Sequence, residues 1–346
     1  MAARAFITGL EGMTLAPAER AFLRDADPWG LILFRRNADT PDQVRRLVDN
    51  FRAAVGRADA PVLIDQEGGR VQRLGPPHWP KYPAGALYGA LYDIDPAAGV
   101  ETARLGARLI AADLAELGIT VDCLPLADVP VAAAHAVIGD RAYGETPQKV
   151  AAIGEAVAAG LMDGGVLPVL KHLPGHGRAN ADSHHSLPVV GVDRARLEAT
   201  DFLAFRPLAG LPLGMTAHVV YTAVDPVAPA TTSKAVISEV IRDWIGFNGA
   251  LMSDDISMNA LSGTLAERTR ASFAAGCDLV LHCNGRLDEV RLVAGETPPL
   301  AGDALRRTEA ALGVHKKADD FDVSEARAAF SAMLARARIS DSLATS

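Results

Sequence analysis

Two clusters of ionisable side chains stand out because each directly follows a short apolar segment. One runs from Lys171 to His184 (KHLPGHGRANADSH), and the other runs from Ser253 to Met258 (SDDISM). In α/β barrels, the side chains that carry out the reaction come from the carboxyl ends of the strands. Short apolar segments are typical of buried strands, so the pattern predicts that both clusters belong to one active site at such a barrel face.

The second cluster offers a carboxylate nucleophile. Asp254 and Asp255 are adjacent on what we expect to be extended backbone, where neighbouring side chains point in opposite directions. One carboxylate can therefore enter the barrel mouth while the other supports a neighbouring loop. An Asp can attack an anomeric carbon and form a glycosyl ester, which divides a difficult displacement into two easier steps. If the two aspartates have no catalytic role, they would instead pair with Arg side chains or cap the next helix.

The first cluster offers an acid and base. A histidine can protonate a leaving oxygen and later deprotonate water, while a nearby carboxylate orients its ring. Asp182 and His184 have the spacing of such a pair. Glycines precede the pair in the sequence, so we expect it on a loop that closes over the substrate. His176 and His185 are better explained as loop histidines that bind the backbone.

Two further segments supply groups that could hold a sugar. Asp65 to Arg73 (DQEGGRVQR) also follows an apolar strand, and its glycines permit a tight turn. Carboxylate and Arg side chains bind vicinal hydroxyls through charge-assisted hydrogen bonds. Ile138 to Arg141 adds another guanidinium, although Arg141 in isolation is typical of a surface charge. No phosphate-loop spacing is present.

The elements that position these groups alternate along the chain. Eight short Val, Ile and Leu-rich segments, separated by segments of helical periodicity, predict parallel strands covered on both faces. They are residues 5–8, 30–34, 61–65, 119–124, 166–170, 213–218, 249–253 and 279–282. Eight such units in 346 residues predict a TIM-type (β/α)8 barrel, and we expect one catalytic domain over residues 1–346. A helical tail is expected from about residue 313, with its helix over 324–338.

Local signals mark several boundaries. Thr40 and Pro41 form an N-cap and a first-turn proline. Four glycines are expected as left-handed residues after helices. They are Gly118, Gly164, Gly246 and Gly276. The segment from Gly75 to Tyr92 is rich in proline and aromatic residues and predicts an ordered loop over the site, although a plain surface connection explains it equally well.

Composition limits the partners and the location. The net charge of −8 comes from interspersed charges without a basic block, which argues against nucleic acid. No signal-peptide core is present and no segment reaches the ~20 apolar residues that span a bilayer, so we expect a cytoplasmic protein without membrane contact. We also expect a monomer that acts on a small molecule. The three cysteines, Cys123, Cys277 and Cys283, are expected to be buried, reduced thiols.

With these residues in place, the chain resembles family-three glycoside hydrolases, and specifically the single-domain bacterial β-N-acetylglucosaminidases of cell-wall recycling. The matching segments follow the family's order. They are residues 30–34, 65–73, 138–141, 171–184, 216–219 and 253–258. The KHLPGHG stretch with its DSH is the most specific part.

The resemblance implies a role for each group. Asp254 would be the nucleophile and His184 the general acid and base, with Asp182 as its partner. The residues implied to hold the N-acetylglucosamine ring are Asp65, Arg73, Arg141, Lys171 and His172. The family is retaining, and we expect no metal or cofactor in this chain. The implied substrate is a muropeptide in which N-acetylglucosamine is β-1,4-linked to 1,6-anhydro-N-acetylmuramic acid.

Three other hypotheses remain open. A metal-dependent hydrolase could use the histidines as ligands, but His172 and His176 have ligand spacing only in a helix, and Pro174 and Gly175 argue against one. A phosphorylase could use the same glycosyl-enzyme, because a histidine acid does not repel phosphate. A catalytically inactive sugar-binding barrel is disfavoured because nucleophile, acid/base and ring-binding groups are all present.

Overall fold

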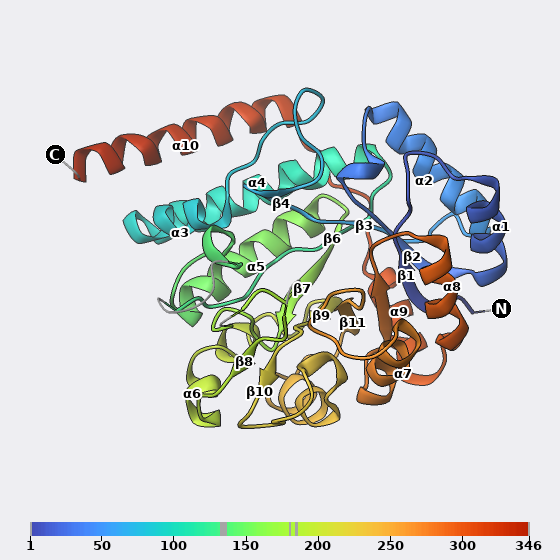
Figure 1. The fold of residues 1–346 in the computed structure, drawn as a ribbon. Coiled ribbons are helices and arrows are strands. Elements are labelled where there is room, and N and C mark those ends of the chain that lie inside the picture. The colour runs from blue at the N-terminus through green and yellow to red at the C-terminus, as the bar shows by residue number, and fades with distance from the viewer. Residues whose placement is uncertain (1, 132–136, 180, 184–185, 345–346) are drawn as a thin grey trace.

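A closed barrel of eight parallel strands forms the centre of the molecule (Figure 1). The computed structural model describes residues 2–131, 137–179, 181–183 and 186–344, with side chains as far as residue 335. The strands pair in the order β1, β12, β11, β9, β7, β6, β3, β2. Their bounds are β1 Arg4–Thr8, β2 Pro28–Leu33, β3 Val62–Ile64, β6 Val121–Asp122, β7 Leu167–Leu173, β9 Leu213–Thr216, β11 Ala250–Asp255 and β12 Leu279–His282. The predicted barrel and all eight predicted strand positions are confirmed.

The strands are apolar throughout because both of their faces are buried. Alternate residues point to opposite faces of a strand. Ile32 and Leu63 therefore belong to the cluster inside the barrel, together with residues of the other barrel strands. Their neighbours Leu31 and Val62 pack outward against the apolar face of α2 (Pro41–Val55).

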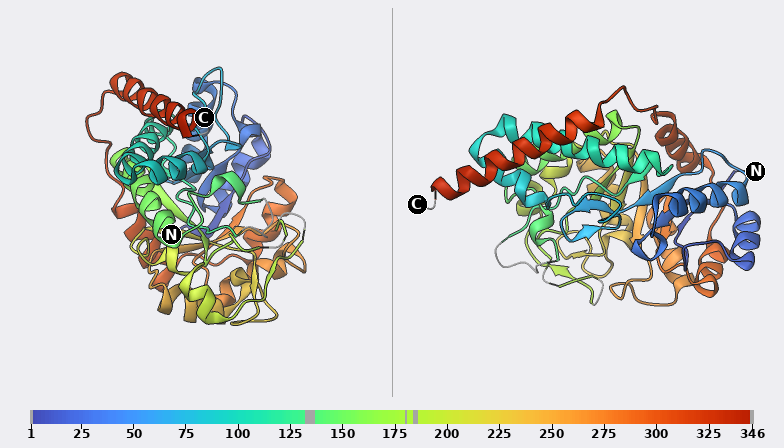
Figure 2. Two further views of the ribbon diagram at one scale, coloured as in Figure 1. Left: turned by 90° about the vertical axis from the view of Figure 1, so that its left-hand side faces the viewer. Right: turned by 90° about the horizontal axis from the view of Figure 1, so that it is seen from above.

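Helices surround the barrel on its outside (Figures 1 and 2). The other α-helices are α1 Pro17–Ala26, α3 Gly85–Ile94, α4 Pro96–Glu116, α5 Pro147–Asp163, α6 Arg194–Ala199, α7 Leu265–Ala275, α8 Leu287–Glu296, α9 Gly302–Gly313 and α10 Val323–Ala344. A π-helix, η5, spans Val236–Trp244, and short 3-10 turns are η1 Arg35–Asn37, η2 Gly139–Arg141, η3 Leu203–Phe205 and η4 Ala230–Thr232. Two small sheets, β4 Gln66–Gly68 with β5 Val71–Gln72 and β8 Val189–Val190 with β10 Val220–Tyr221, lie outside the barrel.

Most of the predicted helix boundaries are confirmed. The Thr40 hydroxyl accepts a hydrogen bond from the Gln43 amide at the start of α2. Left-handed backbone occurs at three of the four glycines expected to have it, with φ of +77°, +82° and +116° at residues 118, 246 and 276. Gly164 is the exception, because the chain after α5 turns one residue later, at Gly165 with φ +71°.

The proline-rich loop before α3 does not cover the site. Residues 85–92 belong to α3, and none of residues 75–92 lines the pocket described below. Instead, the Tyr82 carbonyl accepts a hydrogen bond from Gly69, and the Tyr82 hydroxyl donates to Asp113 on α4 at 2.6 Å. The predicted covering loop is therefore wrong, because Tyr82 packs towards α4 and against the Phe330 ring of the C-terminal helix.

The C-terminal helix packs on α4, as Figure 2 shows. Phe330 is buried, and a Cβ on Gly106 of α4 would approach its ring to 3.0 Å. Arg327 pairs with Asp113 at 2.5 Å. The helix begins one residue earlier and ends six residues later than the predicted helix over 324–338. Within the described residues, no helix is both long and apolar enough to cross a membrane.

The three cysteines are free thiols, and they differ in environment. Cys123 and Cys277 are buried, as predicted. Cys283 is partly exposed and lines the pocket, because the chain leaves the barrel directly after β12. The prediction that it is buried is wrong.

Candidate active site

A pocket of about 320 Å³ opens at the carboxyl ends of the strands. Seven of the eight predicted site residues line it. These are Asp65, Arg73, Arg141, Lys171, His172, Asp182 and Asp254. The eighth, His184, lies outside the described residues. Segments far apart in the sequence therefore meet at one barrel face, where enzymes of this fold carry out their reactions.

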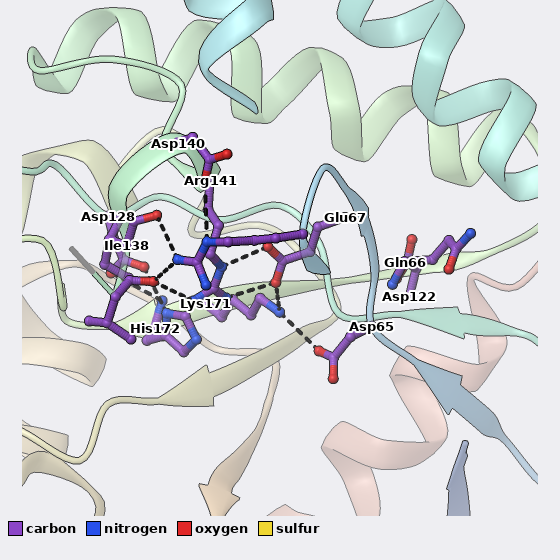
Figure 3. Close-up of polar contacts among 12 residues, drawn as sticks. Asp65, Gln66, Glu67, Asp122, Asp128, Ile138, Asp140, Arg141, Lys171 and His172 are labelled. Carbon is purple, nitrogen blue, oxygen red and sulfur yellow. Dashed lines mark hydrogen bonds and ion pairs between the residues drawn. The ribbon is translucent and has the colours of Figure 1, made fainter. Parts of the chain in front are cut away.

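Lys171 is the centre of a network of charges at the pocket floor (Figure 3). It lies in β7 with only 2% of its side chain exposed, and its ammonium group contacts Asp65 at 3.1 Å and Glu67 at 2.6 Å. Asp65 follows β3 directly and also binds Arg73 at 2.9 Å. A buried lysine requires such partners, since an unpaired charge away from water is costly.

Glu67 joins the network to Arg141, the last residue of η2. Both of its carboxylate oxygens accept hydrogen bonds from the Arg141 guanidinium at 2.8 Å, the bidentate geometry that gives Arg its specificity for carboxylates. The Arg141 side chain is 11% exposed, so its interpretation as a surface charge is wrong. Glu67 belongs to the predicted site only as a member of the 65–73 segment. The signal for its role is its position in the sequence, close to the strand-end Asp65 and to two arginines, Arg70 and Arg73.

The charges in this network keep one another ionised. Burial alone would raise the pKa of Asp65, but Lys171 and Arg73 outweigh it and hold that pKa well below its usual range. Burial likewise opposes ionisation of Glu67, but Arg141 and Lys171 lower its pKa to about 2. Burial also disfavours the charged form of Lys171, but the carboxylates of Glu67 and Asp65 outweigh burial and raise the pKa of Lys171. The pocket floor therefore presents permanent donors and acceptors at neutral pH.

A second cluster contains His172 and His176. His172 Nδ1 lies 2.7 Å from Asp128 Oδ2, and the Asp128 carboxylate is fully buried behind it. The His176 ring is buried, contacts Ser183 Oγ at 3.2 Å and has its pKa lowered to about 4, first by burial and then by His172. His176 is thus a neutral ring within the loop, where it contacts the Ser183 side chain. His185, for which the same backbone-binding role is predicted, lies outside the described residues.

The two aspartates at the end of β11 have different surroundings. The Asp255 carboxylate accepts hydrogen bonds from Ser257 and from the Cys283 amide at 3.1 Å, so it connects the two loops that follow β11 and β12. Asp254 lines the pocket, and its Oδ1 accepts the Asp255 amide at 2.8 Å. This is the division between one pocket carboxylate and one loop-supporting carboxylate that the extended backbone predicts.

His218 supports this strand end from inside the protein. Its ring is fully buried, with Nε2 3.0 Å from the Asp255 carbonyl and Nδ1 2.7 Å from the Thr231 hydroxyl. Because a carbonyl only accepts hydrogen bonds, Nε2 carries the proton and Nδ1 accepts from Thr231. Burial lowers the pKa of His218 and keeps it neutral. Its TAHV segment was matched to the family without a role for this ring.

The loop between β7 and β8 brings Asp182 to the pocket. The neighbouring Ser183 is held by His176 on one side and, through its carbonyl, by the Ala260 amide at 3.1 Å on the other. Among the described residues, no three His, Cys, Asp or Glu side chains are grouped as metal ligands.

Comparison with known proteins connects this geometry to a family. The profile for the "Glycosyl hydrolase family 3 N terminal domain" matches residues 8–297. The chain belongs to glycosyl hydrolase family 3. The family-three resemblance and the predicted enzyme class, a glycoside hydrolase, are confirmed.

Family-three relatives match along most of their length. A β-hexosaminidase of Alkalilimnicola ehrlichii is 42% identical over 280 residues, which cover 80% of this chain and 79% of the relative. A β-hexosaminidase of Aromatoleum aromaticum is 35% identical over 315 residues, which cover 90% and 87%. The crystal structure of NagZ from Neisseria gonorrhoeae in complex with N-trifluoroacetyl-D-glucosamine superposes with a TM-score of 0.83 at 31% identity, covering 97% of this chain and 98% of that one.

Proposed function

We propose that the chain is a retaining exo-β-N-acetylglucosaminidase that removes terminal N-acetylglucosamine from muropeptides, where this sugar is β-1,4-linked to 1,6-anhydro-N-acetylmuramic acid. The observation that carries the proposal is a single pocket that combines Asp254 at a strand end with the network around Lys171. The names of the family-three relatives support the hexosaminidase part.

The pocket floor suits one sugar ring. Asp65 offers acceptors, whereas Arg73 and Lys171 offer donors, and all three are positioned by bonds to one another. Vicinal hydroxyls, each a donor and an acceptor, can bind such a set without rearranging it. Because the groups are already ordered, little additional entropy is lost when the sugar binds.

The reaction proceeds in two steps under this proposal. An Asp254 carboxylate oxygen attacks the anomeric carbon, the bond from that carbon to the leaving oxygen breaks, and His184 gives its proton to that oxygen. His184 then takes a proton from water, whose oxygen displaces Asp254 from the glycosyl ester. Two displacements at one carbon retain its configuration.

Product analysis on a defined muropeptide tests the function. We expect free N-acetylglucosamine, released first as the β-anomer by NMR, together with the anhydromuramyl peptide. Release of the α-anomer would contradict the retaining mechanism. The same reaction in the presence of phosphate tests the phosphorylase alternative. N-acetylglucosamine 1-phosphate as the main product would show that phosphate, and not water, accepts the sugar.

Replacement of His184 tests the acid. His184→Ala should reduce the glycosylation rate most for substrates with poor leaving groups, because these need protonation as the bond breaks. Pre-steady-state rates on an aryl N-acetyl-β-glucosaminide with a good leaving group and on the muropeptide provide the comparison. Equal loss on both substrates would rule out His184 as the acid.

A further inference from the structure

Asp128 is a buried carboxylate between two parts of the site. The segment that carries it runs beside the end of β7, with Leu126 bridged to Lys171 and the Ala127 amide bonded to the Lys171 carbonyl at 2.7 Å. This path places Asp128 beside His172, where it is fully buried and does not line the pocket. Asp128 therefore acts on a substrate only through its neighbours.

The first neighbour is the His172 ring. Asp128 Oδ2 lies 2.7 Å from His172 Nδ1. An ionised carboxylate only accepts hydrogen bonds, so Nδ1 must carry a proton. Burial opposes the ionisation of Asp128, but His172 outweighs it and lowers the pKa of the carboxyl. With Nδ1 occupied, Nε2 is the nitrogen through which the ring can meet a sugar hydroxyl in the pocket it lines.

The second neighbour is the start of the loop after β7. Asp128 Oδ1 accepts the His176 amide at 2.5 Å. The His176 ring in turn contacts Ser183, which precedes the predicted acid/base and follows Asp182. Oδ2 thus contacts the ring of a predicted sugar-binding residue, whereas Oδ1 accepts backbone amides, from His176 at the base of the predicted acid/base loop and more weakly from His172 at 3.4 Å.

We propose that Asp128 is a positioning residue with two separable roles: it fixes the tautomer and direction of the His172 ring for sugar binding, and it anchors the loop that brings Asp182 to the pocket. The first role rests on the proposed function of His172 as a sugar ligand. The two roles use different oxygen atoms, so one substitution can separate them.

Asp128→Asn is the separating variant. It is nearly isosteric and can keep an oxygen at the Oδ1 position for the His176 amide, while its NH2 group faces His172 Nδ1 and turns that nitrogen into an acceptor. In selectively 15N-histidine-labelled protein, the His172 Nδ1 resonance should move from the protonated to the unprotonated range. His172→Asn identifies that resonance among the nine histidines.

Kinetics provide the second readout. Asp128→Asn should raise KM for an N-acetyl-β-glucosaminide about tenfold with a smaller change in kcat. The reason is that the hydrogen bond between His172 Nε2 and the sugar hydroxyl is lost from both the ground state and the transition state. Asp128→Ala removes both contacts and should in addition lower kcat, most strongly for a poor leaving group. Thermal unfolding confirms that each variant is folded.

Asp201→Asn is the matched control. Asp201 is equally buried and binds Arg178 of the same loop at 2.9 Å, without contacting His172. It should leave the His172 resonance and KM unchanged. An unchanged His172 resonance and KM in Asp128→Asn would overturn the tautomer role, and equal kinetics of the Asn and Ala variants would overturn the anchoring role. Failure of the wild type to turn over the substrate would instead refute the proposed function, while the resonance still tests the Asp128 contact.

Discussion

Individual side chains in this site work because their neighbours keep their charge and direction constant. Lys171 lies between Asp65 and Glu67, and Glu67 also holds Arg141 with both oxygens. Breaking such a buried set is more costly than its net contribution suggests, because the remaining charges lose their compensation. The proposed nucleophile, Asp254, lines the same pocket from the end of β11, where its Oδ1 accepts a hydrogen bond from the Asp255 amide at 2.8 Å.

Removal of the proposed nucleophile should abolish turnover while preserving the site. In Asp254→Ala, we expect kcat to fall by about 10⁴-fold, comparable to the loss of one member of a catalytic set in other hydrolases. Binding of N-acetylglucosamine, measured by calorimetry, and the unfolding temperature should remain close to wild type. A near-normal rate would exclude Asp254 as nucleophile.

Glu67 gives a prediction for pH dependence. Its pKa is lowered from 4.5 to about 2 in the folded protein, so the ionised form stabilises the fold fully above about pH 4.5, and this contribution disappears as the pH falls towards 2. We expect Glu67→Gln to lower the free energy of unfolding by about 3 kcal/mol at pH 7, as is usual when one partner of a buried ion pair is removed.

Urea unfolding of wild type and Glu67→Gln between pH 7 and pH 3 measures this difference. The difference in unfolding free energy should shrink as the pH falls below about 4.5, because the ionised form of Glu67 then contributes less to the stability of the wild type. A difference that is constant over the whole range would show that the Glu67 charge has no role in stability.

At the level of elements, the loop after β7 is held at several points along its length. His176 is tied to Asp128, Arg178 to Asp201, and Ser183 to the segment that follows β11. Gly177 lies between these ties, where a Cβ would meet the Val129 carbonyl oxygen at 2.1 Å. The described part of the loop thus depends on a close backbone approach that only glycine permits.

Gly177→Ala should therefore displace this loop. We expect a loss of about 1–3 kcal/mol in unfolding free energy from overpacking, together with a lower kcat/KM. Gly191→Ala is the control, since a Cβ there has no neighbour within 4 Å. Both variants are measured by urea unfolding and by turnover of an N-acetyl-β-glucosaminide. Equal behaviour of the two would contradict the importance of the close approach.

For the whole molecule, the barrel provides the site and the helices outside it provide stability. We propose that the tail from about residue 313 is an integral part of one catalytic domain, because α10 packs on α4 through Phe330 and Ala326 and pairs with Asp113. In the part of α10 whose side chains the structure describes, no residue lines the pocket, and neither does Asp113.

Phe330→Ala tests this packing. Loss of a buried aromatic side chain should lower the unfolding free energy by about 3 kcal/mol, while kcat and KM stay unchanged. If the tail belongs to the barrel domain, one cooperative transition should shift as a whole in calorimetry. A separate early transition for the tail, with an unchanged main transition, would contradict the single-domain proposal.

The sequence by itself determined the strands and the strand-end positions of Asp65, Lys171 and Asp254. This was possible because buried strands have a local apolar pattern, and parallel strands place their carboxyl ends at one face. It also predicted the Thr40 cap, since capping involves residues only three apart. Family resemblance added the roles of these residues.

Only the tertiary structure decided which charges meet. Glu67 and Arg141 are 74 residues apart, and Asp128 and His172 are 44 apart, so no local pattern connects them. The same applies to the proline-rich loop, whose aromatic residues pack against α4 and α10 instead of covering the pocket. The pairing and packing of distant groups depend on how the barrel closes. A buried charge must be paired, and the closed fold decides which partner lies near enough to pair with it.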